Sequence, residues 1–170
     1  MNRALLVSIA LLLALAPATV AFAKSSDRNQ ATTIDAGHSN GNLQGNGKTV
    51  LSQGVVITQG SLQIESAAAD VYMADGEIAR AVFTGKQVKL RQQLDDGTWM
   101  DATADTVDYD LRKETLTMTG NYTVKTARGS NSGQRMTYNL KSGNVESGGD
   151  GSRVRTVIPP KSAQPAQGKN

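Results

Sequence analysis

The sequence predicts an all-β fold in which antiparallel strands form one closed or rolled sheet. Apolar and polar residues alternate with a period of two, most clearly between Ala104 and Lys125, as in strands with one dry and one wet face. Turn signals such as Asp75-Gly76 punctuate the chain, and no long window beyond the first residues keeps a helical period. We therefore expect about 12–16 short strands in one domain, with turns roughly every 8–12 residues.

The alternation between residues 104 and 125 defines three short strands. Val107, Tyr109 and Leu111 are separated by polar residues, and the rhythm resumes after residues 112–114 with the apolar set Leu116, Met118, Tyr122 and Val124. Gly120-Asn121 marks a further bend. One face of each strand should therefore be buried and the other should meet water.

The same unit recurs along the chain. Ala69-Asp70 and Ala104-Asp105 lie 35 residues apart, as do Thr84-Gly85 and Thr119-Gly120. A looser third copy starts near Gly133-Gln134. Self-similarity at a fixed spacing predicts stacked copies of one supersecondary unit that cannot bury its apolar face alone.

The first residues have the form of a secretory signal peptide. Met1-Asn2-Arg3 is basic, residues 4–15 are apolar apart from Ser8, and Ala21-Phe22-Ala23 fits a cleavage site. We predict a signal peptide over 1–23; an uncleaved membrane anchor is the alternative. Removing 23 of 170 residues leaves 147, enough for one domain.

The remaining boundaries follow composition. Residues 24–31 are polar and are predicted to be a flexible segment, and residues 32–158 form the β domain. Pro159-Pro160 ends the last strand, so residues 159–170 are predicted to be a disordered tail. In order, the predicted strands cover residues 32–35, 49–51, 55–58, 61–65, 70–74, 77–84 and 87–91, the three strands within 104–125, a strand near 133–141, and a last strand over 153–158.

Composition excludes several classes of protein. The formal net charge of +3 falls to about +2 without Arg3, which is too mild for a nucleic-acid binder that neutralises many phosphates. There is no cysteine, so sheet pairing and core burial must hold the domain together without disulfides. Aromatic residues make up 4% of the chain and hydrophobic residues 38%, which predicts a thin core with an incompletely filled interior.

No pattern of residues predicts catalysis. His38 is the only histidine and lies in a Gly/Asn/Ser stretch. Asp108 and Asp110 are expected on the wet face of their strand, and Asp95-Asp96-Gly97 lacks the further oxygen ligands of a calcium loop. Asn121-Tyr122-Thr123 matches a glycosylation acceptor, but we interpret it as part of a strand. We expect a protein that is not an enzyme and has no catalytic residue, no metal site and no cofactor.

An ordered set of motifs resembles the OstA-like family. The matching segments, spread over about residues 30 to 160, are Gln44-Gly45-Asn46, residues 58–64, Ala69-Asp70, residues 84–86, residues 104–109, residues 119–121, residues 133–138 and residues 154–159. The resemblance implies a single antiparallel β-jellyroll, V-shaped in section and open at both ends. It also implies a periplasmic protein of outer-membrane biogenesis whose apolar interior binds the lipid A acyl chains of lipopolysaccharide during transport.

The resemblance further implies partners and site residues. Such proteins associate end to end and connect an LptC-like inner-membrane component with an LptD-like outer-membrane component. The implied lipid-binding residues are Thr32, Ile34, Leu43, Leu62, Ile64, Tyr72, Leu90, Val107, Tyr109, Leu116, Met118, Val124, Met136 and Tyr138. The expected partner edges are residues Thr32, Thr33, Ile34 and Asp35 at one end and Arg153, Val154, Arg155, Thr156, Val157 and Ile158 at the other. Lys86, Lys89 or Arg91 could meet head-group phosphates at a rim.

Two other functions share part of this pattern. A small outer-membrane β-barrel also alternates apolar and polar residues, but its strands would be longer and flanked by aromatic girdles. A periplasmic carbohydrate-binding sandwich would be expected to expose several aromatic platforms, and Trp99 is the only tryptophan. Extraction with or without detergent separates the barrel from the transport protein.

Overall fold

The computed structural model describes residues 25–42 and 45–160, and strands dominate this part of the chain. In chain order the elements are η1 (Ser25–Asn29), β1 (Thr32–Gly41), β2 (Gly47–Gln59), β3 (Leu62–Ser66), β4 (Ala68–Ala74), β5 (Glu77–Gln93), β6 (Trp99–Asp110), β7 (Thr115–Thr126), β8 (Gly129–Asn139), β9 (Val145–Ser147) and β10 (Arg155–Val157). The predicted signal peptide, Leu43 and residues 161–170 of the predicted tail lie outside the described residues.

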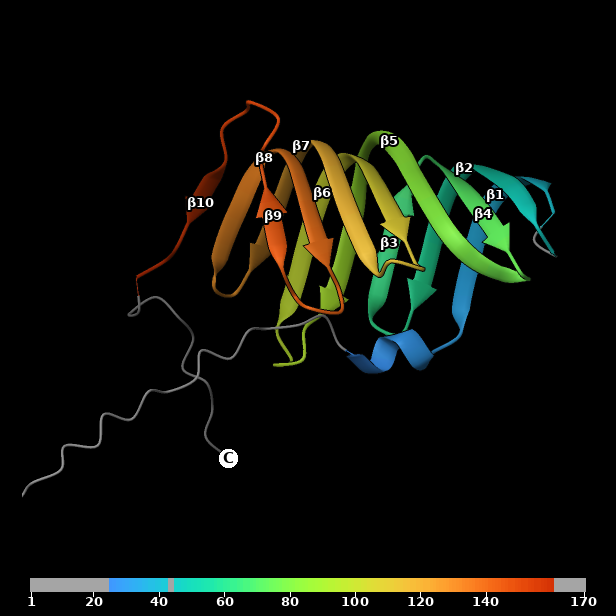
Figure 1. Ribbon diagram of the computed structural model, residues 1–170, viewed down its shortest axis with the longest axis horizontal. Coiled ribbons are helices and arrows are strands. Elements are labelled where there is room, and N and C mark those ends of the chain that lie inside the picture. Colours follow the sequence, from blue (N-terminus) through green and yellow to red (C-terminus); the bar gives the residue numbers. More distant parts are fainter. Residues whose placement is uncertain (1–24, 43–44, 161–170) are drawn as a thin grey trace, which may run out of the picture.

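All ten strands of the described chain belong to one antiparallel sheet, as predicted. The strand order is β1-β2-β3-β5-β6-β7-β8-β10. Strands β3 and β4 follow one another between β2 and β5, and β9 and β10 both pair with β8. Figure 1 shows the result as two layers of strands, with β1 at one end of the molecule and β10 at the other.

A crease runs across the sheet and folds it into these two layers. The pairing register shifts at one point in each of four strand pairs. The shift lies between Ala36 and His38 for β1 with β2, Thr84 and Val88 for β5 with β6, Thr103 and Thr106 for β6 with β7, and Thr119 and Tyr122 for β7 with β8. Ala67, between β3 and β4, continues the same line: its carbonyl accepts from Gly54 at 3.2 Å and its amide donates to Thr84 at 3.1 Å. Such bulges bend a strand and increase its twist.

We call the two layers A and B. Layer A contains residues 32–36, 55–59, β3, residues 88–93, 99–104, 122–126 and 129–133, and β10; layer B contains residues 38–41, 47–51, β4, residues 77–84, 106–110, 115–119 and 135–139, and β9. The V-shaped, rolled sheet expected for a jellyroll follows from this division.

The strand count differs from the expected 12–16 short strands. The described chain has ten strands, of which β5 reaches 17 residues. The reason is that β1, β2, β5, β6, β7 and β8 pass through the crease into both layers, whereas β3, β4, β9 and β10 stay in one, which gives eight segments per layer. Bends that look like strand ends in the sequence are bulges within continuous strands.

Glycine is required at the crease because neighbouring strands approach closely there. A side chain on Gly120 would place its Cβ 2.8 Å from the Cβ of Asp105, and Gly120 has a φ of +77°. On the next strand pair, a Cβ on Gly85 would lie 3.1 Å from the Cβ of Ala67. These glycines end the first two predicted repeats. Each copy is one hairpin of layer B that starts past the crease and returns to it: β4 with β5, β6 with β7, and β8 with β9.

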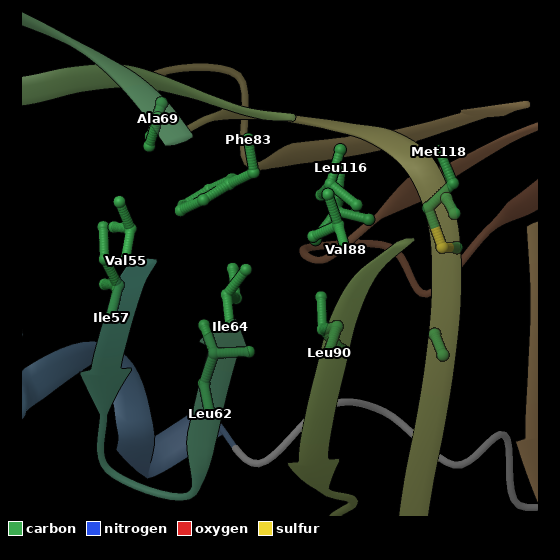
Figure 2. Close-up of a cluster of buried hydrophobic side chains, with 14 of the residues drawn as sticks. Val55, Ile57, Leu62, Ile64, Ala69, Phe83, Val88, Leu90, Leu116 and Met118 are labelled. Atoms are coloured by element: carbon green, nitrogen blue, oxygen red, sulfur yellow. The ribbon is translucent and has the colours of Figure 1, made fainter. Parts of the chain in front are cut away.

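The core lies between the layers and includes residues predicted by alternation, among them Val107, Leu116, Met118, Tyr122 and Val124. Val55, Ile57, Leu62 and Ile64 of layer A face Ala69 and Phe83 of layer B (Figure 2). Phe83 and Ile64 are each 1% exposed, and burying one such side chain contributes about 1.5–3 kcal/mol.

A short helix precedes the sheet where the sequence predicts a flexible segment. In η1, Asp27 is 5% exposed and accepts a hydrogen bond from Ser61 Oγ in the turn between β2 and β3. The same hydroxyl accepts from the Gln93 amide at 3.1 Å. This contact, which joins residues 34 positions apart, orders the segment and could not be read from its polar composition.

Candidate functional site

An apolar cavity of about 250 Å³ lies between the two layers, in the half of the molecule toward β8 and β9. Layer A and the turns at its edge contribute Leu90, Gln92, Leu94, Met100, Ala102, Val124, Thr126 and Arg128, and layer B and its turns contribute Leu116, Met118, Met136, Tyr138, Leu140, Gly143 and Val145. A water molecule takes about 30 Å³ of liquid volume, so the cavity has room for a stretch of acyl chain.

The interior toward β1 is filled by its own side chains. The space there is only about 20 Å³ and is lined by residues that include Ile57, Phe83 and Tyr109. The wider half instead has Ala102 and the flexible side chains Met100, Met118 and Met136 on its walls. Methionine adapts to irregular apolar neighbours, so these walls suit a chain whose shape varies.

The mouth of the cavity is formed by turns of the two layers. Leu94 and Arg128 lie at neighbouring turns of layer A, and Leu140 and Gly143 lie in the turn between β8 and β9 of layer B. Leu94 is held in a tight turn, where its amide donates to the Thr98 carbonyl at 2.8 Å.

An ion pair joins the two turns of layer A at this mouth. Arg128 Nη2 lies 2.9 Å from Asp96 Oδ2. Asp96 also accepts hydrogen bonds from the Thr98 amide at 3.0 Å and from Thr98 Oγ1 at 2.6 Å. The hydrogen bonds from Thr98, together with Arg128, hold the pKa of Asp96 below its usual value, so this carboxylate stays ionised near neutral pH.

A second, more open space lies at the surface beside the cavity, toward the end of the molecule. It measures about 190 Å³ and shares Val124, Thr126 and Arg128 with the first. Its other walls are residues 129–131 of β8 together with Thr156, Val157 and Ile158. This open depression therefore lies between the wall of the cavity and the strand edge at β10.

The predicted partner edges lie at the two ends of the sheet. In the described chain β1 pairs only with β2, so Thr32, Thr33, Ile34 and Asp35 are on an edge strand. At the other end β10 covers Arg155–Val157 and pairs only with β8, while Arg153, Val154 and Ile158 flank it. Such edges present backbone groups that another strand can pair with.

Exposed apolar side chains gather at the β9 and β10 end. Val145 is 53% exposed, Val157 47% and Ile158 78%. Asn131 of β8 connects this end to the core: it accepts from the buried Tyr122 hydroxyl at 2.5 Å and donates to Thr156 Oγ1 at 2.9 Å.

The structure brings most of the predicted lipid-binding residues into one interior. Leu62, Ile64, Leu90, Val107, Leu116, Met118, Val124 and Met136 are buried in the core, and Ile34, Tyr109 and Tyr138 pack against it. Leu90, Leu116, Met118, Val124, Met136 and Tyr138 line the larger cavity. Thr32 is exposed on β1 and borders the small space at the other end.

Tyr72 is a correction, because it lies on the outer face. Its neighbours Val71 and Met73 are buried, whereas the Tyr72 ring lies between two cations, 5.7 Å from Lys48 Nζ and 5.6 Å from the Arg80 guanidinium carbon. Three successive apolar residues leave the inward face undecided in the sequence. Burial alternates strictly along β4, so with Val71 and Met73 inside, Tyr72 points outward.

The cations expected at a rim are placed elsewhere. Lys89 and Arg91 are exposed on the outer face of layer A, where Arg91 stacks on Trp99 at 4.5 Å. Lys86 lies in the register shift of the crease. None of these three residues lines the larger cavity.

Several cavity residues were not predicted from the sequence. Leu94 and Met100 continue the alternation of their strands, so extending the pattern through the turn at 95–98 would have found them. Leu140 likewise continues the alternation of Met136 and Tyr138, whereas Val145 has no such pattern around it. Arg128 carried no sequence signal, because its partner Asp96 is 32 residues away.

Chemistry beyond apolar contact is sparse in the described part of the chain. Residues 25–42 and 45–160 contain no group of three or more His, Asp or Glu side chains that could hold a metal ion. Within the same ranges, no helix has the length and hydropathy to cross a membrane. Asp108 and Asp110 lie on the outer face, where Asp108 pairs with Arg80 and Asp110 with Lys113.

Comparison with known proteins identifies relatives of this chain. Residues 33–144 match the family described as "LptA/(LptD N-terminal domain) LPS transport protein". The lipopolysaccharide export system protein LptA of Haemophilus influenzae is 34% identical over 155 residues, which is 88% of each chain. The protein of the same name from Escherichia coli K12 is 30% identical over 158 residues, covering 91% of this chain and 85% of the relative.

A solved structure shares the fold. The crystal structure of LptH from Pseudomonas aeruginosa, described as the LptA homologous periplasmic component of a lipopolysaccharide transport device, superposes with a TM-score of 0.70. The match covers 79% of this chain and 99% of LptH at 21% sequence identity.

Proposed function

The chain belongs to the LptA/(LptD N-terminal domain) family of lipopolysaccharide transport proteins, and from this premise we propose that it carries lipid A acyl chains in the cavity between its two layers. The observation that supports this proposal is the apolar cavity of about 250 Å³ between the layers. An acyl chain placed there leaves water without any covalent chemistry.

The energetics favour such a site. Each methylene exposed to water costs about 0.8 kcal/mol, so a ten-carbon stretch of chain costs roughly 8 kcal/mol. Walls built from Leu116, Met118, Met136 and their neighbours would remove much of this cost. Because the interior toward β1 is nearly filled, the part of the molecule toward β8 and β9 would hold the chain first.

The two sheet edges supply the second part of the proposal. Edge strands β1 and β10 stand at opposite ends of the sheet, and strand addition at an exposed edge uses main-chain hydrogen bonds. In this proposal copies of the chain join end to end, and the terminal copies pair with an LptC-like inner-membrane component and an LptD-like outer-membrane component. The signal peptide predicted over residues 1–23 would deliver the protein to the periplasm, where relatives such as LptH act.

Site-specific photocrosslinking tests the cavity assignment. A photoreactive side chain replaces Met118, which is 4% exposed and lines the cavity. The matched control is Thr117, the preceding residue on β7, whose hydroxyl is on the outer face near Thr137. We expect lipopolysaccharide to be captured at 118 and not at 117. Equal capture at both positions, or none at 118 in a folded protein, would contradict the proposal.

A further inference from the structure

A buried amide lies among the apolar walls of the cavity. Gln92 of β5 is 5% exposed and lines the cavity of about 250 Å³. Its carboxamide has no hydrogen-bond partner within residues 25–42 and 45–160. In the same ranges, Thr49 Oγ1 is the one fully enclosed side-chain polar atom without a partner. The unpaired amide of Gln92 therefore borders open space, and that space is the cavity.

The nearest neighbours of Gln92 on the cavity wall are apolar. Leu90 and Leu94 stand two residues before and after it on the same face of the chain, and both are buried. Met100 is its pairing partner on β6 and also lines the cavity. An amide without a partner in such surroundings is unfavourable, so a polar group on the molecule that fills the cavity would supply what the walls do not.

Gln92 lies a short distance inside the mouth. Leu94 is at the mouth, in the turn that follows β5. A strand rises about 3.4 Å per residue, so Gln92 lies about 7 Å farther in than Leu94, and Leu90 lies as far again beyond it. A chain that keeps its head group at the mouth would pass Gln92 with its first few carbons and Leu90 with later ones.

We propose that Gln92 binds a hydroxyl group carried by an acyl chain a few carbons from its head, so that the cavity prefers hydroxylated chains. This inference rests on the proposed function, because it specifies which acyl chains the cavity takes. A carboxamide offers two N–H donors and one carbonyl acceptor, and a hydroxyl both donates and accepts. The two groups can therefore bond reciprocally, whereas an ester carbonyl would pair with the N–H groups alone.

The preference follows from what a plain chain leaves unpaired. Methylenes packed over Gln92 would cover its donor and its acceptor without replacing their hydrogen bonds, whereas a hydroxyl satisfies them. Sites that hydrogen-bond a hydroxyl of their ligand discriminate for this reason against analogues that lack it. For a pair of neutral groups we expect a preference of about tenfold.

Three ligands with the same head and chain length test the inference. They are dodecanoic acid, the same acid with a hydroxyl on its third carbon, and the same acid with a hydroxyl on its last carbon. Binding of each is measured by calorimetry below its critical micelle concentration. The variant is Gln92→Met, which keeps the length of the side chain and suits the methionine-rich walls. The matched control is Gln87→Met, at an exposed glutamine of the same strand outside the cavity.

We expect the wild type to bind the acid with the hydroxyl on its third carbon about tenfold more tightly than the plain acid. Gln92→Met should abolish this preference and bind the plain acid at least as tightly as the wild type does. The acid with the terminal hydroxyl should gain nothing from Gln92, because its hydroxyl would lie deeper among apolar walls. Gln87→Met should behave as the wild type. The melting temperature of Gln92→Met should not fall, because the variant removes an amide that has no partner within the protein.

Other outcomes overturn the inference. If the wild type binds the plain acid and the acid hydroxylated on its third carbon equally well, Gln92 does not select a hydroxyl, while binding of both keeps the proposed function intact. The same conclusion follows if the preference survives in Gln92→Met, or if the position of the hydroxyl makes no difference. A clear fall in the melting temperature of Gln92→Met would assign the amide to the stability of the protein instead. If the wild type binds none of the three acids, the proposed function fails together with the inference.

Discussion

Replacing Ala102 by phenylalanine should block the cavity without disturbing the fold. Ala102 is 3% exposed and its side chain lines the cavity from β6. The six ring carbons that the substitution adds would enter a space of about 250 Å³ rather than a packed core. We therefore expect the melting temperature of Ala102→Phe to stay close to that of the wild type.

The loss of binding follows from the space that the ring takes. If the ring displaces about six methylenes of an acyl chain at about 0.8 kcal/mol each, the upper limit of the loss is about 5 kcal/mol. A flexible chain can shift within the Met-rich walls, so we expect a loss of at least tenfold, or about 1.4 kcal/mol. Calorimetric titration with a monoacyl lipid measures it.

The matched control lies two residues away on the same face of the same strand. Ala104 is fully buried and lines no described cavity, so Ala104→Phe forces extra volume into a packed core and should destabilise the protein by about 1–3 kcal/mol. Equal destabilisation by both variants would mean that the cavity is not open. A stable Ala102→Phe protein that binds lipid as well as the wild type would refute the placement of the chain.

Two further predictions concern the sheet edges and the crease. Asp35 of β1 and Arg155 of β10 carry opposite charges at the two ends of the sheet. Asp35→Arg should therefore weaken end-to-end association, and adding Arg155→Asp should restore it, as measured by sedimentation at several concentrations. A double variant that associates no better than the single variant would argue against pairing of these edges. Gly120→Ala should lower stability by about 1–3 kcal/mol in urea denaturation, because its Cβ would lie 2.8 Å from the Cβ of Asp105. Gly76→Ala is its control, since Gly76 shares a φ near +80° but has nothing within 4 Å; equal losses for both would show that the close approach at the crease contributes nothing.

Much of the fold could be predicted from the chain alone. Alternation with a period of two identifies which residues share a face, and it identified Leu116, Met118 and Val124 as one buried row. The spacing of 35 residues between Gly85 and Gly120 correctly indicated a repeated hairpin. These patterns depend only on residues that are close in sequence, so they can be recognised without knowing which strands are neighbours.

The remaining features depend on contacts between distant residues. A bulge and a turn look alike in sequence, so only strand pairing shows that β5 continues through Gly85. Where several apolar residues follow one another, alternation also does not say which of them point inward. The outward position of Tyr72 depends on the cations Lys48 and Arg80 on neighbouring strands.

The sequence by itself determined an all-β chain with one apolar face per strand, because side chains alternate along any extended backbone. Only the tertiary structure decided where the interior stays empty and which charge stands at its opening. Both depend on how the two layers meet across the crease. Large side chains fill one half of the interior, whereas small and flexible side chains leave space in the other half. Arg128 lines that space from a turn in which it forms an ion pair with Asp96.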